Sequence, residues 1–277
     1  LWFLEEHCDL VILETGIGGL LDATNVVKMP LVTAITSISF DHMALLGNTL
    51  LEIPAQKAGI VKPGCPVVLS PDNTDEVKAY VAQTAEQKNA PFLTPNMQDC
   101  HILSESLCET VFQYHSFSYT LHMPGRHQVC NAMTAIEMIR LLGMHGYPIS
   151  AATAQAAFAG VRVPARTEIL RQEPLVLLDG GHNQAGVMAL AELLRRCGIR
   201  PIHGICGMLT TKDYSTACSI LKSVFDTVIC VDDFLEKAVP ADSLAKCFAP
   251  MPSIRTADSF QNAYAEALAQ AKTDHGM

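Results

Sequence analysis

Residues 8–25, CDLVILETGIGGLLDATN, decide the fold class of this chain. The apolar run 10–13 has the composition of a buried strand, and Glu14 and a glycine-rich turn follow it directly. Open α/β sheets bind ligands at the carboxyl ends of their strands, where a carboxylate can hold a metal ion against a phosphate. We therefore expect an α/β enzyme, with a strand over residues 10–14 and Glu14 at its functional edge.

A second polar group follows the apolar run 31–38 and contains Asp41 and His42. Parallel strands end at one edge of a sheet, so Glu14 and His42 can share one Mg²⁺, although oxygen atoms are its usual ligands. Lys57 stands in an otherwise apolar helix end. Each residue also has a plainer explanation: a solvated carboxylate, a loop histidine, and a lysine whose amine reaches solvent. Together they indicate a nucleotide-using active site.

The glycines after Glu14 do not form a dinucleotide fingerprint, because GxGxxG requires a third glycine where this chain has Leu21. No GxxxxGK[ST] sequence occurs either. Residues 16–19 are equally well explained as a tight turn.

Composition narrows the function classes. With 277 residues and 49% hydrophobic residues, the chain is long enough for two domains. A net charge of −9 without a basic stripe argues against nucleic acid as a partner. No apolar stretch has the length of a membrane span and no signal peptide is visible, so the cytoplasm is the expected compartment. The ten cysteines include no CxxC pair and are expected to be reduced.

Alternating strand and helix patterns predict parallel α/β layering. Expected strands cover residues 10–14, 31–38, 66–69, 175–178, 202–206 and 227–231. Expected helices cover 51–60, 74–88, 131–143, 150–159, 184–196, 214–224, 241–248 and 259–271. Residues 111–121 are typical of an antiparallel hairpin or meander, expected to close off the first domain's sheet. The periodicity stops near residues 160–165, which predicts a domain boundary there.

The residues resemble one family closely. Glu14 and its glycine turn are similar to folylpolyglutamate synthase/dihydrofolate synthase, a branch of the Mur ligase superfamily. The resemblance continues in order along nearly the whole chain, through LDATN (21–25), Asp41-His42, KAGI (57–60), His127-Gln128 with Asn131-Ala132, PAR (164–166) with Glu168, LDGGHN (178–183) and Lys212-Asp213.

The resemblance implies an ATP-dependent amide ligase. A folate or dihydropteroate carboxylate attacks the γ-phosphate of ATP, and the amine of L-glutamate then attacks the acyl phosphate. The resemblance assigns Glu14 and His42 to Mg²⁺, and Lys57 and His182 to catalysis, Lys57 being carbamylated in relatives. It assigns Asn131, Arg166 and Asp179 to ATP, and Gly18, Gly19 and Asp22 to the substrate.

The expected architecture is a partial P-loop-type Mur ligase central ATPase domain over residues 1–163, followed by a smaller, incomplete Rossmann-like domain over 164–277. The resemblance implies that the sequence lacks the N-terminal phosphate loop and the extreme C-terminus, so that this polypeptide alone is inactive. We expect a monomer. Two alternatives stay open: a muramyl-peptide ligase of the same superfamily, and a truncated paralogue without catalytic activity.

Overall fold

The computed structural model describes residues 2–38 and 52–277. Its contacts divide the chain into two compact units: Leu1–Met97 with Cys130–Ser150, and Gln98–Val129 with Ala151–Met277. No helix in the described ranges has both the length and the hydropathy needed to cross a membrane. The domain boundary at residues 163 and 164 stays a prediction.

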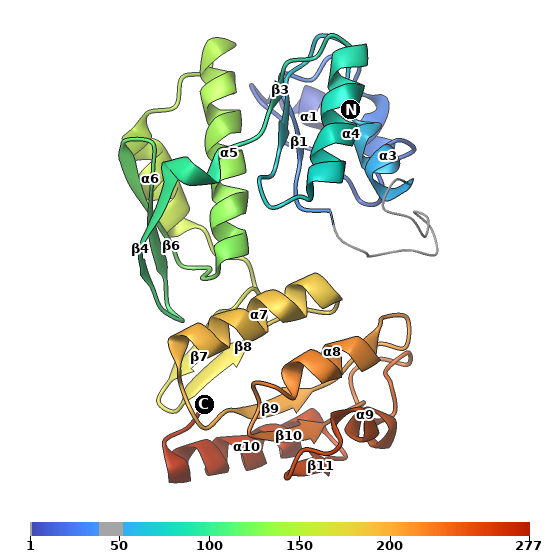
Figure 1. Ribbon diagram of the computed structural model, residues 1–277, viewed down its shortest axis with the longest axis vertical. Coiled ribbons are helices and arrows are strands. Elements are labelled where there is room, and N and C mark those ends of the chain that lie inside the picture. The colour runs from blue at the N-terminus through green and yellow to red at the C-terminus, as the bar shows by residue number, and fades with distance from the viewer. Residues whose placement is uncertain (1, 39–51) are drawn as a thin grey trace. The chain divides into compact units, whose positions relative to one another are not determined.

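The first unit contains a parallel sheet, in the order β1 (Thr33–Ile35), β2 (Val67–Leu69) and β3 (Phe92–Leu93). Helices α3 (Glu52–Ala58) and α4 (Asp75–Gln87) pack with β1 and β2 in one buried apolar cluster (Figure 1). The parallel layering expected from the sequence is confirmed for this unit.

Three further helical segments belong to this part of the chain. They are α1 (Trp2–Glu5), a short 3₁₀ helix at Ala23–Val26, and α5 (Arg126–Met144) from Cys130 onward. Helix α5 begins five residues before the predicted start at residue 131, because the polar residues Arg126, His127 and Gln128 form its first turn. Another 3₁₀ turn covers Met97–Asp99.

The strand predicted at residues 10–14 is wrong. The segment has no strand pairing in the described residues, and Val11, Ile12 and Leu13 are 42%, 93% and 44% exposed. A parallel strand is stable when neighbouring strands bond its backbone and helices cover its faces. Neither condition is met in the described part of the chain, so apolar composition alone does not make this segment a strand.

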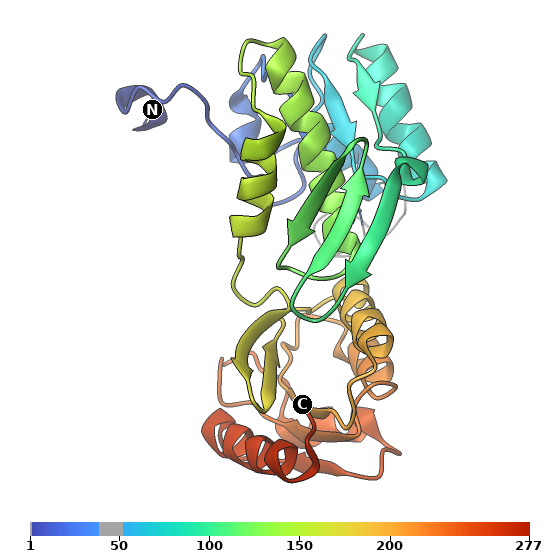
Figure 2. The same ribbon diagram turned by 90° about the vertical axis from the view of Figure 1, so that its left-hand side faces the viewer.

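The second unit contains an antiparallel meander of β4 (Cys100–Glu105), β5 (Thr110–Tyr114) and β6 (Phe117–Leu121), covered by α6 (Ala151–Gly160). The ring of Tyr119 stacks on Phe112 and meets Phe158 of α6 edge-on, both at 5.5 Å between centroids. The predicted antiparallel pairing is confirmed. The meander forms a sheet of its own, however, and does not close the first sheet as expected (Figure 2).

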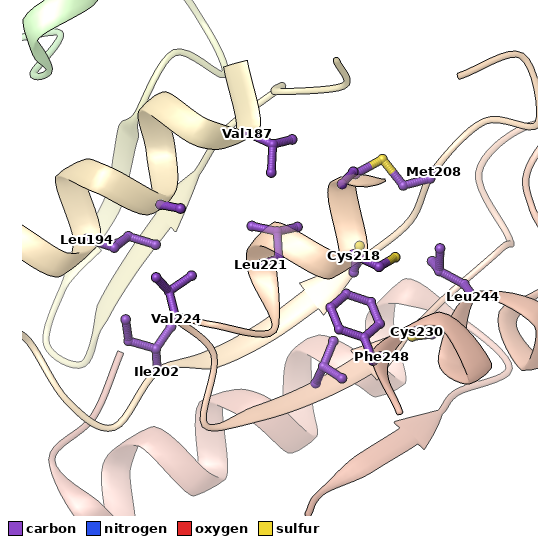
Figure 3. Packing of buried hydrophobic residues seen from close by; sticks show 14 of the residues in the cluster. Val187, Leu194, Ile202, Met208, Cys218, Leu221, Val224, Cys230, Leu244 and Phe248 are labelled. Carbon is purple, nitrogen blue, oxygen red and sulfur yellow. The ribbon is translucent and has the colours of Figure 1, made fainter. Parts of the chain in front are cut away.

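The same unit contains a parallel sheet of β9 (His203–Cys206), β10 (Thr227–Cys230) and β11 (Ile254–Thr256). Alternation sends Val228 and Cys230 to one face and Ile229 and Val231 to the other. The first face packs against α7 (Gln184–Cys197), α8 (Tyr214–Leu221) and α9 (Ala241–Phe248), where Phe248 is fully buried near Cys218 (Figure 3). The second face is covered by α10 (Phe260–Asp274).

A hairpin of β7 (Glu168–Gln172) and β8 (Leu175–Leu178) precedes this sheet and is not hydrogen-bonded to it. Strands β8 and β9 instead line a largely apolar cavity of about 230 Å³, to which Asp179 and Gly181 also contribute. The carboxyl end of β8 thus presents polar residues beside an apolar interior. The sequence pattern identified β8 and missed β7.

Candidate active site

The glycine turn of the first unit packs against the end of α3. Gly18 and Gly19 have φ values of 67° and 148°, which residues with side chains rarely adopt. The backbone N–H of Leu20 donates to the carbonyl of Gln56 at 2.8 Å. A Cβ atom on Gly19 would lie 2.8 Å from that same oxygen. The turn therefore needs glycine both for its conformation and for its close approach to the helix.

Lys57 lies in the last turn of α3, beside this contact, and is partly buried. The side chain of Asn25 donates to the carbonyl oxygens of Leu20 at 2.9 Å and Gly59 at 3.3 Å, and Lys62 Nζ donates to Asn25 O at 3.0 Å. These bonds join the glycine turn, the segment after it and the end of α3 into one local assembly. Two motifs far apart in the sequence meet as a result.

Asp22 organises the turn through both carboxylate oxygens. Oδ2 accepts from the N–H groups of Gly16 and Ile17, each at 3.0 Å, and Oδ1 accepts from the N–H and hydroxyl of Thr24 at 2.9 and 2.6 Å. These bonds, led by the one from the Thr24 hydroxyl, lower the pKa of Asp22 to about 2. Asp22 therefore shapes the loop in which the sequence placed a substrate contact.

The predicted magnesium site is only partly within the described structure. Glu14 is exposed, and its carboxylate offers the oxygen donors that Mg²⁺ prefers. His42 lies outside the described residues. In residues 2–38 and 52–277, no group of three His, Cys, Asp or Glu side chains could hold a metal ion. Glu14 fits Mg²⁺ chemically, and its role as a ligand stays a prediction.

Asn131 lies on α5 and is partly buried. It belongs to the first unit, as do Glu14, Lys57 and the glycine turn. The other predicted ATP residues, Arg166 and Asp179, belong to the second unit. The role of Asn131 in binding adenine also stays a prediction.

In the second unit, Asp179 fastens the segment that carries Arg166. Asp179 Oδ2 accepts from the N–H and hydroxyl of Thr167 at 2.9 and 3.3 Å, and Oδ1 accepts from Gly181 N–H at 2.8 Å. Gly180 N–H donates to Ala165 O at 2.7 Å. The structure therefore brings together two motifs that the sequence separates, and Arg166 is exposed.

His182 and Asn183 follow in the same loop, before α7. His182 Nδ1 lies 3.0 Å from Gly180 O, a contact that requires the proton on Nδ1 and makes Nε2 the acceptor of the neutral ring. Asn183 Oδ1 accepts from Gly186 N–H at 2.9 Å and caps α7, as its position before a helix predicts. The cap fixes the end of the loop, and His182 is exposed.

Sequence reasoning missed Thr167 as part of this site. The residue is 4% exposed, has a φ of 52°, and bonds to Asp179. A lone threonine between an arginine and a glutamate has no distinctive pattern. Only the fold, which places β7 beside the loop after β8, reveals its partner.

Comparison with known families accounts for both parts of the chain. Residues 2–139 match the Mur ligase middle domain, and residues 165–276 match the Mur ligase glutamate ligase domain. The chain belongs to the Mur ligase family.

Two curated relatives are folylpolyglutamate or dihydrofolate synthases. The dihydrofolate synthase/folylpolyglutamate synthase of Bacillus subtilis is 34% identical over 258 residues, which cover 89% of this chain and 58% of the relative. The folylpolyglutamate synthase of Lacticaseibacillus casei is 32% identical over 237 residues, which cover 83% of this chain and 55% of that relative. The chain thus spans a little over half the length of these relatives.

Solved structures agree with the sequence relatives. The Mycobacterium tuberculosis folylpolyglutamate synthase complexed with ADP and AMPPCP has a TM-score of 0.84 and 27% identity, covering 98% of this chain and 64% of the other. Escherichia coli FolC in complex with DHPP and ADP has a TM-score of 0.80 and 27% identity, covering 97% and 62%. The α/β fold expected from the sequence is confirmed, and this Mur ligase chain has the fold of the folylpolyglutamate synthases.

Proposed function

We propose that the protein containing this chain is an ATP-dependent ligase that joins L-glutamate to a folate or dihydropteroate carboxylate. The observation that carries the proposal is the 34% identity with a dihydrofolate synthase/folylpolyglutamate synthase over 89% of the chain. Support comes also from relatives whose structures contain ADP, AMPPCP and DHPP. The expected cofactors are ATP and Mg²⁺, and the expected assembly is a monomer.

The reaction proceeds in two displacements. A carboxylate oxygen of the folate attacks the γ-phosphorus of ATP, the bond to the bridging oxygen breaks, and ADP leaves. The amine nitrogen of glutamate then attacks the acyl carbon, and phosphate and a proton leave. Both steps build negative charge on phosphate oxygens, so positioned cations lower their barriers.

Arg166 supplies such a cation in this proposal. Its planar guanidinium suits phosphate oxygens, and its backbone is fixed to the loop of Asp179 through Ala165 and Thr167. Asp179 and Asn131 contact the nucleotide, while Lys57 and His182 act at the reacting groups. His182 Nε2 is the acceptor for the proton released by glutamate when Nδ1 donates to Gly180 O.

The remaining assignments concern the substrate and the metal. Gly18 and Gly19, in the turn ordered by Asp22, contact the folate through the backbone of that turn in this proposal. Glu14 and His42 would hold Mg²⁺, which supplies charge neutralisation at the phosphates. The muramyl-peptide ligase and the non-catalytic paralogue are outcomes of the experiment below.

The test is glutamate incorporation by the full-length protein that contains these residues. Radiolabelled glutamate, ATP and Mg²⁺ are supplied with dihydropteroate, tetrahydrofolate or a muramyl substrate. We expect incorporation that depends on a pteroate or folate and releases one ADP per amide bond. Incorporation only with the muramyl substrate would assign the protein to the other branch, and no incorporation with any acceptor would refute ligase activity.

A pair of arginine variants links that activity to the site. Arg166→Ala should lower kcat/KM for ATP by about 10²-fold, a typical loss when one group that stabilises transition-state charge is removed. Arg171→Ala is the matched control, since Arg171 is exposed and its Nε donates to the carbonyl of nearby Glu173 at 2.6 Å. Equal losses in the two variants would remove Arg166 from the active site.

A further inference from the structure

The backbone on both sides of Arg166 has an unusual conformation. Ala165 and Thr167 have φ values of 55° and 52°, in the left-handed region. A β-branched residue is rare there because its branched side chain crowds the backbone. Such conformations persist only where the surrounding structure fixes them, and they gather at functional sites. The left-handed backbone of Ala165 and Thr167 therefore indicates a functional constraint on the segment that carries Arg166.

Hydrogen bonds fix the segment on both sides of the arginine. After it, the N–H and hydroxyl of Thr167 both donate to Asp179 Oδ2, at 2.9 and 3.3 Å. Before it, Ala165 accepts from Gly180 N–H at 2.7 Å and donates to Glu168 Oε2 at 2.9 Å. The segment cannot relax to an ordinary extended backbone without losing these bonds.

The same loop leaves room for the arginine side chain. Arg166 is exposed, and a Cβ atom placed on Gly180 would lie 3.5 Å from its Nη1. The guanidinium therefore lies beside a residue that has no side chain. The two adjacent residues differ in burial. Thr167 is 4% exposed and bonds to Asp179, while Arg166 is accessible to solvent.

We propose that Thr167 is a positioning residue, which holds Arg166 in a strained backbone so that its guanidinium meets the β- and γ-phosphates of the nucleotide. This inference rests on the proposed function, because it takes the nucleotide to be ATP. Thr167 does not touch the nucleotide. It acts through Arg166, and its hydroxyl supplies the second of the two bonds that lock the segment to Asp179.

The test compares nucleotide affinities of the full-length protein by isothermal titration calorimetry, using AMPPCP and AMP. Thr167→Val keeps the shape of the side chain but loses the hydroxyl, and should weaken AMPPCP binding about fivefold, the equivalent of one ordinary hydrogen bond. AMP lacks the β- and γ-phosphates, so its affinity should be unchanged. Thr167→Ser keeps the hydroxyl and should restore AMPPCP binding to within about twofold of wild type.

Thr216→Val is the matched control. The N–H of Thr216 donates to Asp213 Oδ1 at 3.1 Å and its hydroxyl bonds the same carboxylate, but this pair caps α8 and flanks no arginine. Removing the Thr216 hydroxyl should leave AMPPCP affinity unchanged. If Thr167→Val fails to fold, Thr167→Gly replaces it, because glycine accepts the left-handed backbone while removing the hydroxyl.

The outcomes distinguish this inference from the proposed function. If wild type binds no nucleotide, both fall. If Arg166→Ala weakens AMPPCP binding while Thr167→Val and Thr167→Gly bind normally, only the role of Thr167 falls. If Thr167→Val weakened the binding of AMP as much as that of AMPPCP, the effect would be generally structural and the positioning role would be overturned. The same would hold if Thr216→Val weakened AMPPCP binding as much as Thr167→Val does. A rise in KM for ATP with kcat within about twofold of wild type would support it.

Discussion

Replacing Gly19 with alanine should destabilise the first unit and displace the end of α3. The new Cβ atom would lie 2.8 Å from Gln56 O, 3.0 Å from Ile60 Cγ2 and 3.2 Å from Lys57 O. Two of these atoms are backbone, so the helix end or the turn must move. The φ of 148° at Gly19 adds conformational strain for any residue with a side chain.

The expected cost follows from these two effects. Holding alanine in a conformation reserved for glycine costs about 2 kcal/mol, and relieving the clash by breaking the Leu20 to Gln56 hydrogen bond costs about 1 kcal/mol more. A total of about 3 kcal/mol, divided by a urea dependence of about 2 kcal/mol per molar, lowers the unfolding midpoint by roughly 1.5 M.

Gly64→Ala is the matched control, because Gly64 has a φ of 70° but a Cβ atom added there would meet open space, with nothing within 4 Å. It should lose only about 1 kcal/mol, from backbone strain. Urea unfolding followed by circular dichroism measures both variants, and amide exchange in α3 locates the effect. Equal midpoints for Gly19→Ala and Gly64→Ala would refute the argument that close packing of the turn on α3 requires glycine.

Three further predictions concern single contacts. Asn183→Ala should lower the free energy of unfolding of the second unit by about 1 kcal/mol, because α7 loses its N-cap; thermal unfolding measures it. Arg196→Ala should cost about 2 kcal/mol, because Glu105, bonded by Arg196 at 2.7 and 3.1 Å, is left partly buried without that cation; a double-mutant cycle with Glu105→Gln isolates the pair. Asp22 should titrate near its pKa of about 2, below the usual 3.9, in NMR shifts of the loop amides.

The lowered pKa of Asp22 makes the stability of the fold depend on pH. Because folding lowers the pKa of Asp22, its contribution to stability is complete above about pH 4 and is lost as the pH falls toward 2. Asp22→Asn should abolish the titration, and a midpoint near 4 in wild type would contradict the hydrogen bonds described. For the other two predictions, an unchanged Asn183→Ala midpoint or a coupling energy of zero would be contrary results.

The pattern of apolar residues predicted most helices and the parallel strands β1, β2, β9 and β10, because amphipathic periodicity is local information. The short strands β3 and β11 were missed. Strand β8 and helix α9 have the predicted bounds, and the cap by Asn183 was readable from its place before α7. The strand predicted at residues 10–14 is absent from the described part of the chain because its formation is not decided by local information. Their composition favours a strand, but strand formation depends on partners that a local pattern does not specify.

The sequence by itself determined the fold class and the chemical character of the candidate site, since residue types and their order carry that information. Only the tertiary structure decided which groups meet: Asp22 with the amides of its own turn, and Asp179 with Thr167. A carboxylate in a sequence is equally suited to a ligand, a cap or a loop clamp. Its hydrogen-bond donors come from backbone that folding brings within 3 Å, and their geometry selects the role.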